Sequence, residues 1–568
     1  MWAGALTLLD TSPVRYAAAA WAVFAVTVAA AAGTTLPWGA RRWWRNPAVF
    51  AALALLSIVA FRWPLLCDNR ELQDPDESQM ISSALTLNQD PLYWKSVDGQ
   101  TRGPMDDWPL LAILRTSGRL DYTGARLVGV FLAWACVMCA WLALRHTFTD
   151  QWARLLVLPL LAVHAFSDFW GFVQYGSEHV ADALVALASA FLLAAWRPSD
   201  PAPNPRRLLV AGLALGAVPF AKLQAVPIAA WVAAFGAWWI VATPRAGRRG
   251  PCLASLLGGA LVVPLAMLLW IVGSGIWRDF SEGYIWDNIR YAGDRWFSWA
   301  QTPAKLMELC ELAPGGRAFL LWATPAAFLA LFAFPFFSRP QRRCTAFALG
   351  LVTASAYAAM APGRMFPHYL QLTFFPAGLL LGITAGAAIE AARGMAADRP
   401  RIRAAAQAAI IAAFLALGLA PQVVWRALEG QPSQGRFVAT RGVLQRTAVA
   451  DAILKHSRAG ERLAIWGWGP KFWVQTGLIQ ATRDGNTSRQ IEEASKETHY
   501  YRDRFMSDLI KSRPPVLIDT VGEGNFSYHD RDAAGHETFE DLARFMRANY
   551  RQVGDIEGTR IYVRDGRD

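Results

Sequence analysis

Residues 47–78, PAVFAALALLSIVAFRWPLLCDNRELQDPDES, join a long apolar run to a compact acidic group. The run at 47–66 is long enough to cross a bilayer as a helix, for which about 20 residues suffice. Three carboxylates follow within four residues, at Asp74, Asp76 and Glu77. Carboxylates held beside hydrocarbon are costly and usually mark a functional site, so this stretch is a candidate reaction site. The alternative is an acidic loop that is simply solvated.

The composition of the whole chain is that of an integral membrane protein. Of its 568 residues, 54% are hydrophobic and only 17% are charged, whereas soluble domains carry about 25% charged residues. The formal net charge is +11, but most arginines fall in short connectors between apolar runs, where membrane topology requires them. We therefore interpret the charge as a sign of topology and expect no nucleic-acid partner.

Apolar runs of membrane-spanning length recur along the first three quarters of the chain. They predict a polytopic α-helical membrane protein with about 12 transmembrane helices. The predicted spans are 14–36, 47–66, 124–146, 153–170, 180–196, 208–222, 225–243, 252–273, 318–337, 345–361, 369–392 and 404–425.

The connectors between these runs predict the orientation. Basic connectors, which the positive-inside rule assigns to the cytoplasm, are 40–45, 197–207, 245–249, 339–343 and 393–403. The opposite, outer face then carries both termini and the loops 67–123, 171–179, 222–224, 274–317 and 362–368. The Ala- and Arg-rich composition favours a bacterial inner membrane, with the outer face in the periplasm. Cys67 and Cys310 fall on this oxidising side, and whether they pair is left open.

The sequence becomes typical of a soluble protein from about residue 430. Strand patterns occur at 462–467, 516–519, 552–556 and 560–563, and helix patterns at 442–456, 501–511 and 539–549. Alternating helices and strands predict a small α/β domain. We therefore divide the chain into a transmembrane domain, 1–428, and an outer-face α/β domain, 429–568.

The predicted outer loops gather carboxylates, cations and aromatic rings. Carboxylates activate a hydroxyl group or bind a metal, cations hold phosphate, and aromatic rings stack on sugars. Besides Asp76 and Glu77, the candidate site residues are Tyr175, Glu178, His179, Lys222, Arg290, Arg364, His368 and Tyr369.

Four stretches of these loops resemble the GT-C superfamily of integral membrane glycosyltransferases, in particular the protein O-mannosyltransferases and the lipid A aminoarabinose transferases. They are the Asp76-Glu77 pair after an early span, DGQTRGP at 98–104, YGSEH at 175–179 and GRMFPHY at 363–369. The resemblance covers the membrane region and its layout, with a C-terminal domain on the outer face.

The resemblance implies transfer of a sugar from a polyprenyl-phosphate donor to a hydroxyl group of a cell-envelope glycan, lipid or protein, with inversion at the anomeric carbon. Asp76 maps onto the acid that acts as the base or orients the acceptor in the family, and Glu77 is the second acid of that pair. The implied substrate and phosphate site consists of Lys222, Arg364, His368, Tyr369, Arg290 and Tyr175. Glu178 and His179 supply a second carboxylate or a metal site; relatives differ in needing a divalent ion, so that need stays open.

Several of these residues also have purely structural interpretations. Asp74 is suited to capping the helix that begins near Glu77, and Glu77 itself would complement the positive end of that helix. Lys222 would extend its ammonium to the membrane interface from a short span. Two other functions remain: an oligosaccharide ligase of the O-antigen type, which would depend more on outer-loop Arg and His, and a transporter or flippase of lipid-linked sugars. A transporter predicts paired half-repeats, and the sequence shows no clear internal repeat.

Overall fold

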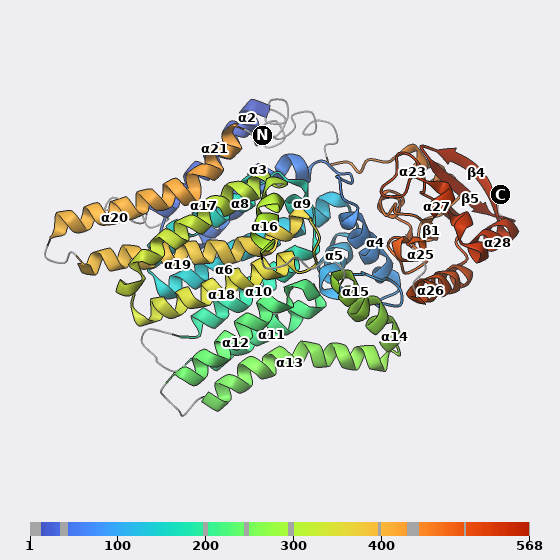
Figure 1. Ribbon diagram of the computed structural model, residues 1–568. Helices are drawn as coiled ribbons and strands as arrows, with labels where there is room; N and C mark the ends of the chain where they lie inside the picture. The colour runs from blue at the N-terminus through green and yellow to red at the C-terminus, as the bar shows by residue number, and fades with distance from the viewer. Residues whose placement is uncertain are drawn as a thin grey trace. The chain divides into compact units, whose positions relative to one another are not determined.

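The computed structural model describes residues 13–33, 44–196, 203–243, 249–293, 300–395, 399–428, 442–492 and 496–566. The chain forms two compact units that each draw on three separate segments (Figure 1). The helical unit contains Met1–Leu65, Gly129–Trp270 and Ile289–Ala439, and the mixed unit contains Leu66–Val128, Ile271–Asn288 and Thr440–Asp568. The first loop after residue 66 therefore belongs to the same unit as the C-terminal domain. The predicted domain boundary at 428/429 adjoins 429–441, which lies outside the described residues.

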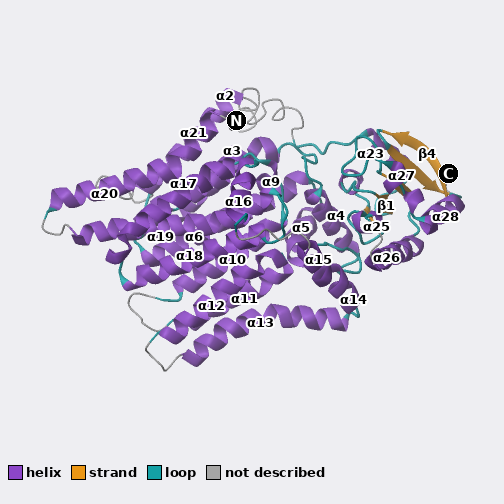
Figure 2. Cartoon of the chain, in the orientation of Figure 1, coloured by secondary structure: helices purple, strands orange, loops and turns teal. Residues whose placement is uncertain are grey.

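Helices make up the described part of the helical unit (Figure 2). Those wholly or mostly within it are α2 (Pro13–Gly33), α3 (Pro47–Leu66), α6 (Tyr122–Thr147), α7 (Asp150–Leu156), α8 (Leu158–Phe166), α9 (Trp170–Val173), α10 (Ser177–Ala194), α11 (Pro205–Ala217), α12 (Val226–Ala242), α13 (Arg249–Gly273), α15 (Asp287–Gly293), α16 (Thr302–Glu311), α17 (Pro314–Ala330), α18 (Arg339–Met360), α19 (Gln371–Met395), α20 (Pro400–Phe414) and α21 (Ala420–Leu428). Short helical turns connect some of them: η1 (Val218–Phe220), η2 (Leu223–Ala225), η5 (Leu331–Phe336), η6 (Pro367–Leu370) and η7 (Leu415–Leu419).

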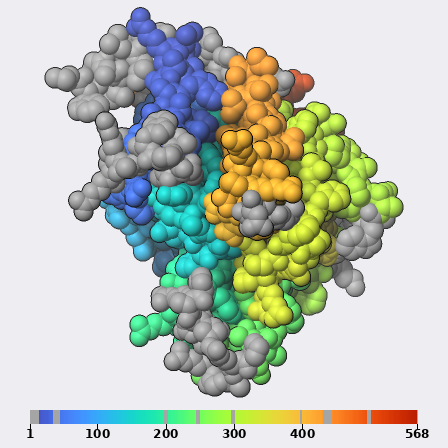
Figure 3. All heavy atoms as spheres, turned by 90° about the vertical axis from the view of Figure 1, so that its left-hand side faces the viewer, coloured from blue at the N-terminus to red at the C-terminus, as the bar shows by residue number. Residues whose placement is uncertain are grey.

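Helix α19 forms the centre of this unit. The whole of its most apolar stretch is buried, and it packs against α17, α18, α20 and α10. By contrast, only 22% of the corresponding stretch of α13 is buried, as expected for a helix that faces lipid. Figure 3 shows one face of the molecule on which early segments in blue and cyan and late segments in yellow and orange meet. The bundle is thus closed by contacts between distant parts of the chain.

Nine helices of the described residues are long and apolar enough to span a membrane, against the dozen expected from sequence. Three predicted spans are not among them. The run at 153–170 is divided into α7 and α8, and the run at 208–222 forms α11, whose 13 residues cover about 20 Å of a hydrocarbon core about 30 Å thick. The run at 345–361 lies in α18, which is 22 residues long but begins with several basic residues. These nine helices indicate a multi-pass membrane protein. The total of twelve spans stays a prediction.

The mixed unit combines two helices of the first loop with the C-terminal domain. Helices α4 (Asp76–Gln89) and α5 (Pro104–Ser117) pack against each other, and α4 also contacts α24 (Lys471–Thr476) and β2 (Ile479–Gln480). The side chain of Gln480 donates to Ser82 Oγ over 2.9 Å. The other helical segments are α14 (Trp277–Phe280), the π-helical turn η4 (Ser281–Trp286), α23 (Ala448–Lys455), α25 (Ser488–Ile491), α26 (Lys496–Ser512), α27 (Arg531–Ala534), η8 (His536–Thr538) and α28 (Glu540–Asn549).

A five-stranded sheet in the order β2-β1-β3-β5-β4 organises the C-terminal domain. Strands β1 (Arg462–Trp466), β2 and β3 (Val516–Asp519) run parallel, while β5 (Thr559–Arg564) is antiparallel to β3 and to β4 (Tyr550–Ile556). Successive side chains of a strand face opposite sides. Accordingly Trp466 lies in a core with α26 and α28, and Ile465 lies in a second core with α23 and α24.

The four strands expected from sequence occur close to their predicted positions, and β2, with two residues, is an addition too short to give a periodic pattern. Helix α23 is shorter than the predicted helix 442–456 because Thr447 caps it, accepting a hydrogen bond from Ala450 N over 3.4 Å. Cys310 is buried and forms no disulfide within the described residues.

Candidate functional site

The acidic stretch that follows α3 forms the start of α4. Pro75 precedes the helix, and Asp76 and Glu77 occupy its first turn, where the helix dipole favours negative charge. The carboxylate of Asp74 accepts a hydrogen bond from Asp76 N over 2.9 Å, so Asp74 does satisfy a backbone donor at the helix start, as its structural interpretation required.

The two acids of the pair have different surroundings. Glu77 is buried, with 1% exposure, and its Oε2 lies 2.7 Å from Arg126 Nη2 in a two-point ion pair. Asp76 is half-buried, and within the described ranges its carboxylate oxygens have no hydrogen bond or ion pair. Neighbouring helix residues point in different directions, so one acid is neutralised inside the protein and the other stays available to a ligand.

Arg126 holds the acidic stretch in place. Besides Glu77, its guanidinium donates to the carbonyl oxygens of Asp68 over 2.5 Å and Arg70 over 2.7 Å. The sequence reasoning did not single out this residue. One sequence feature could have identified it: Arg126 lies near the start of an otherwise apolar span, and an arginine in such a place requires a buried partner.

Replacing Arg126 by Gln is expected to lower the free energy of unfolding by about 3–5 kcal/mol, because Glu77 would keep a buried charge without its partner. The double variant Arg126→Gln/Glu77→Gln should recover much of the loss. Thermal unfolding in detergent measures both. Arg119→Gln is the matched control: Arg119 pairs with Asp121 but is 75% exposed, so its loss should cost no more than about 1 kcal/mol. Equal destabilisation by both single variants would contradict the buried role of Arg126.

A second group of charges meets inside the helical unit. Glu178 lies in the first turn of α10, Lys222 between η1 and η2, and His368 in η6. Lys222 Nζ forms an ion pair with Glu178 Oε1 and hydrogen bonds to Ser177 Oγ over 2.7 Å. His368 Nε2 lies 3.8 Å from the same Glu178 oxygen. Lys222 is only 4% exposed, so it does not reach the interface as its structural interpretation proposed.

Lys222 owes its position to a break between two helices. Helix α11 ends at residue 217 and α12 begins at 226, with Pro219 in η1 and Pro227 at the start of α12. Proline lacks the backbone donor needed inside a helix. The long helix is therefore broken between α11 and α12. This break brings the Lys222 ammonium close to Glu178 in the first turn of α10.

Aromatic rings continue this group. Lys222 Nζ lies 4.9 Å from the centre of the Tyr369 ring, and the Tyr369 hydroxyl is 3.2 Å from that of Tyr291. The guanidinium of Arg364 lies 4.6 Å above the Tyr291 ring, and in the described part of the chain its Nε has no hydrogen-bond partner. Arg290 precedes Tyr291 in α15 and is half-buried. The predicted residues Lys222, His368, Tyr369 and Arg364 are thus brought together with Glu178, and Tyr291 is added to them.

His179 is in the first turn of α10, and its ring lies against that of Tyr175, which precedes the helix. The two rings stack at 6.1 Å with 14° between their planes, and His179 Nδ1 accepts a hydrogen bond from Gly176 N over 3.2 Å. His179 Nε2 is directed toward α6 at Gly129. Glu178 Oε1 is paired with the Lys222 ammonium, while His179 Nε2 lies near Gly129; a metal site at Glu178 and His179 stays a prediction.

The described residues contain one group of three close metal-type ligands, Asp519, His536 and Glu537 in the C-terminal domain. Arginines occupy its surroundings, with Arg560 Nη1 2.6 Å from Glu537 and Arg531 Nη1 3.9 Å from Asp519. These cations already balance the carboxylates, so we interpret the group as an ion-pair network.

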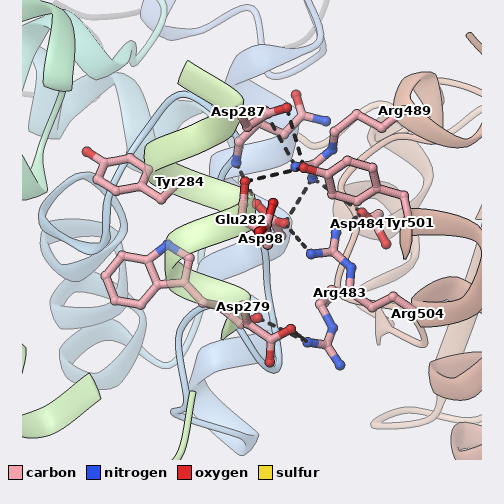
Figure 4. A network of polar contacts seen from close by, with 12 residues as sticks. Asp98, Asp279, Glu282, Tyr284, Asp287, Arg483, Asp484, Arg489, Tyr501 and Arg504 are labelled. Carbon is pink, nitrogen blue, oxygen red and sulfur yellow. Dashed lines mark hydrogen bonds and ion pairs between the residues drawn. The ribbon is translucent and has the colours of Figure 1, made fainter. Parts of the chain in front are cut away.

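A larger network joins the first loop to the C-terminal domain within the mixed unit (Figure 4). Asp98 Oδ2 lies 2.8 Å from Arg504 Nη1 and 2.9 Å from Arg489 Nη2, and both arginines also contact Asp484. Arg489 Nη1 is 3.5 Å from Asp287. Burial alone would raise the pKa of Asp98, but the two guanidinium groups outweigh it and lower that pKa to about 2.

Substituting Asp98 by Asn is expected to lower the unfolding free energy by about 2 kcal/mol, since the pKa falls from 3.8 to about 2 and each unit is worth about 1.36 kcal/mol. Because the folded pKa is depressed, this contribution is complete above about pH 3.8 and disappears as pH falls through about 2. Melting curves of wild type and variant should stay separated down to about pH 4 and converge below it. Glu540→Gln, at an 85% exposed position, is the control; a pH-independent separation would contradict the ionic origin.

Comparison with solved structures shows the class of fold. The structure of ArnT from Cupriavidus metallidurans bound to undecaprenyl phosphate matches with a TM-score of 0.57 and 16% identity, covering 91% of this chain and 97% of that chain. The apo form of the same protein matches with a TM-score of 0.54 and 14% identity, covering 91% of this chain and 98% of that chain. The Archaeoglobus fulgidus oligosaccharyltransferase tethered to an acceptor peptide has a TM-score of 0.45 and 11% identity. The match covers 85% of this chain and 70% of that chain.

No protein-family profile matches the sequence, and no curated protein matches it. The likeness to ArnT extends over nearly the full length of both chains. The chain therefore has the fold of ArnT, which is a member of the GT-C superfamily.

Proposed function

We propose that the protein is an inverting membrane glycosyltransferase that moves a sugar from a polyprenyl-phosphate donor to a hydroxyl group of an acceptor. General support comes from the GT-C fold and from ArnT, a protein of this fold that was solved with undecaprenyl phosphate. The observation that carries the proposal is the state of Asp76. It is a carboxylate fixed at the start of α4 without a partner in the described residues, beside a second acid that Arg126 neutralises.

Asp76 acts as the general base in this mechanism. It accepts the proton of the acceptor hydroxyl as that oxygen attacks the anomeric carbon, and the bond from this carbon to the phosphate oxygen breaks. Catalysis by a positioned base contributes about 10²–10⁴ in rate. Glu77 is paired with a buried arginine, so we assign it the role of fixing the first turn of α4, and Asp76 alone takes the proton.

The cationic group of the helical unit holds the phosphate that leaves. Lys222, His368 and Arg364 supply positive charge or hydrogen-bond donors, and arginine binds phosphate oxygens through two parallel N–H groups. Glu178 keeps the Lys222 ammonium in place. We assign the contacts with the sugar and the lipid phosphate to Tyr369 and Arg290, and the support of the α10 start to Tyr175.

The remaining proposals rest on the apolar runs, the charge of the connectors and the change of composition near residue 430. We propose twelve spans, a reaction site and C-terminal domain on the periplasmic face of a bacterial inner membrane, a transmembrane domain of residues 1–428 and an α/β domain of residues 429–568. The acceptor is a cell-envelope glycan, a lipid or a secreted protein.

The test is mass spectrometry of envelope glycans, lipids and secreted proteins from a strain that lacks the gene, complemented with wild type or with Asp76→Asn. We expect loss of one defined sugar that only wild type restores, which would identify donor sugar and acceptor together. Accumulation of an unattached oligosaccharide on a pyrophosphate carrier would instead indicate a ligase of the O-antigen type. Full restoration by Asp76→Asn would remove the catalytic role and favour transport.

A further inference from the structure

A polar cavity of about 420 Å³ lies in the mixed unit, where α4 ends. Its walls come from three parts of that unit: the segment Asp90 to Ser96, the strand ends near Arg462 and Thr482, and the C-terminal end of α26 near Lys511. Pockets that bind small ligands have volumes of about 300–1,000 Å³. None of the roles assigned above uses this cavity.

The cavity carries positive charge that the protein itself leaves uncompensated. Arg483 is already saturated, because both its Nε and its Nη2 lie 2.8 Å from the Asp508 carboxylate and its Nη1 lies 2.9 Å from Asp279. Lys95 and Lys511 differ: both are exposed, and the described ranges offer neither of them an ion-pair partner. The Trp94 carbonyl accepts from Arg483 Nη1 over 3.2 Å, which fixes the segment that carries Lys95.

Two buried hydroxyl groups line the same cavity without a partner. Thr482 is 1% exposed and Ser96 is 7% exposed, and among the described residues neither Thr482 Oγ1 nor Ser96 Oγ makes a hydrogen bond. Leaving a buried hydroxyl unsatisfied is destabilising, so native proteins rarely do so without a reason. A polar ligand in the cavity would satisfy both groups.

We propose that this cavity binds a phosphorylated sugar of the acceptor. The two ammonium groups match an anionic phosphate, the hydroxyl groups match a sugar or phosphate oxygen, and the volume exceeds what a bare phosphate fills. This inference rests on the proposed glycosyl transfer. Helix α4 runs for 14 residues from Asp76 to Gln89, about 21 Å, and the cavity begins at the next residue. An acceptor that joins the cavity to Asp76 is therefore an oligosaccharide rather than a single sugar.

Calorimetric titration of the full-length protein in detergent with glucose 1-phosphate, glucose and inorganic phosphate tests the assignment. We expect glucose 1-phosphate to bind more tightly than inorganic phosphate, glucose not to bind, and the affinity to fall with salt, since exposed charges are screened. The double variant Lys95→Gln/Lys511→Gln should raise the Kd about tenfold, because two charge-assisted contacts are lost together and a tenfold change corresponds to about 1.4 kcal/mol.

Thr482→Val is an independent test of ligand binding in the cavity. Because its hydroxyl has no partner to lose, the variant should keep the melting temperature of wild type and still weaken binding. Lys455→Gln, an exposed lysine of α23, is the control and should bind as wild type does. Unchanged Kd in the Lys95/Lys511 double variant, or equal affinity for phosphate and glucose 1-phosphate, would overturn the assignment. Asp76→Asn should bind glucose 1-phosphate normally, so failure of the cavity and failure of the proposed transfer reaction give different results.

Discussion

Asp76→Asn is expected to slow sugar transfer by about 10²–10⁴ while the protein keeps its fold, because the substitution removes the proposed general base and little else. The carboxylate makes no contact with the described residues that Asn would lose. The measurement is transfer of a radiolabelled sugar from a polyprenyl-phosphate donor in membranes, together with thermal unfolding of the purified variant.

Asp74→Asn is the matched control for this experiment. Its side chain accepts a hydrogen bond from the backbone at the start of α4, and Asn caps helices about as well as Asp. We therefore expect near-normal transfer from a variant that loses the same charge two residues away. A large loss from Asp74→Asn, or near-normal turnover by Asp76→Asn, would move the base elsewhere in the site.

Breaking the ion pair between Lys222 and Glu178 is expected to be the second large effect. Each single variant, Lys222→Met or Glu178→Gln, should lower the unfolding free energy by about 3–5 kcal/mol, because the remaining partner becomes a buried uncompensated charge. The double variant should regain most of the stability, since replacing a buried pair by neutral groups is often nearly neutral. It should nevertheless stay inactive, because the ammonium that we propose as the ligand of the leaving phosphate is gone.

This split between stability and activity distinguishes a catalytic pair from a structural one. Thermal unfolding in detergent and the transfer assay, applied to the same three variants, measure it. Lys305→Gln is the control within the helical unit: Lys305 lies 2.7 Å from Glu308, but the side chains are 37% and 52% exposed, so its effect should not exceed about 1 kcal/mol. An active double variant would show that the pair only stabilises the bundle.

Hydropathy and short patterns were enough to predict the class of protein. The apolar run at 47–66 forms α3, and nine such helices occur among the described residues, because burial in lipid depends on local composition. Four strands and three helices of the C-terminal domain were likewise predictable, since the short apolar run 463–466 and the Pro514-Pro515 break after α26 are local signals. Three predicted spans are not among these nine helices: prolines lie where two of the apolar runs are broken, and the third run lies in a continuous helix with a basic start. Run length alone is therefore an incomplete signal.

Only the tertiary structure decided what each charged residue does. Asp76 and Glu77 are adjacent in the sequence, and both were predicted as site residues. The difference between their surroundings comes from Arg126, which pairs with Glu77 and lies 49 residues further along the chain. Lys222 meets Glu178 across 44 residues, and Asp98 meets Arg504 in the C-terminal domain. A buried charge must find an opposite charge, but the sequence does not say which one lies nearby. That choice is made by the packing of distant segments, which local patterns do not encode.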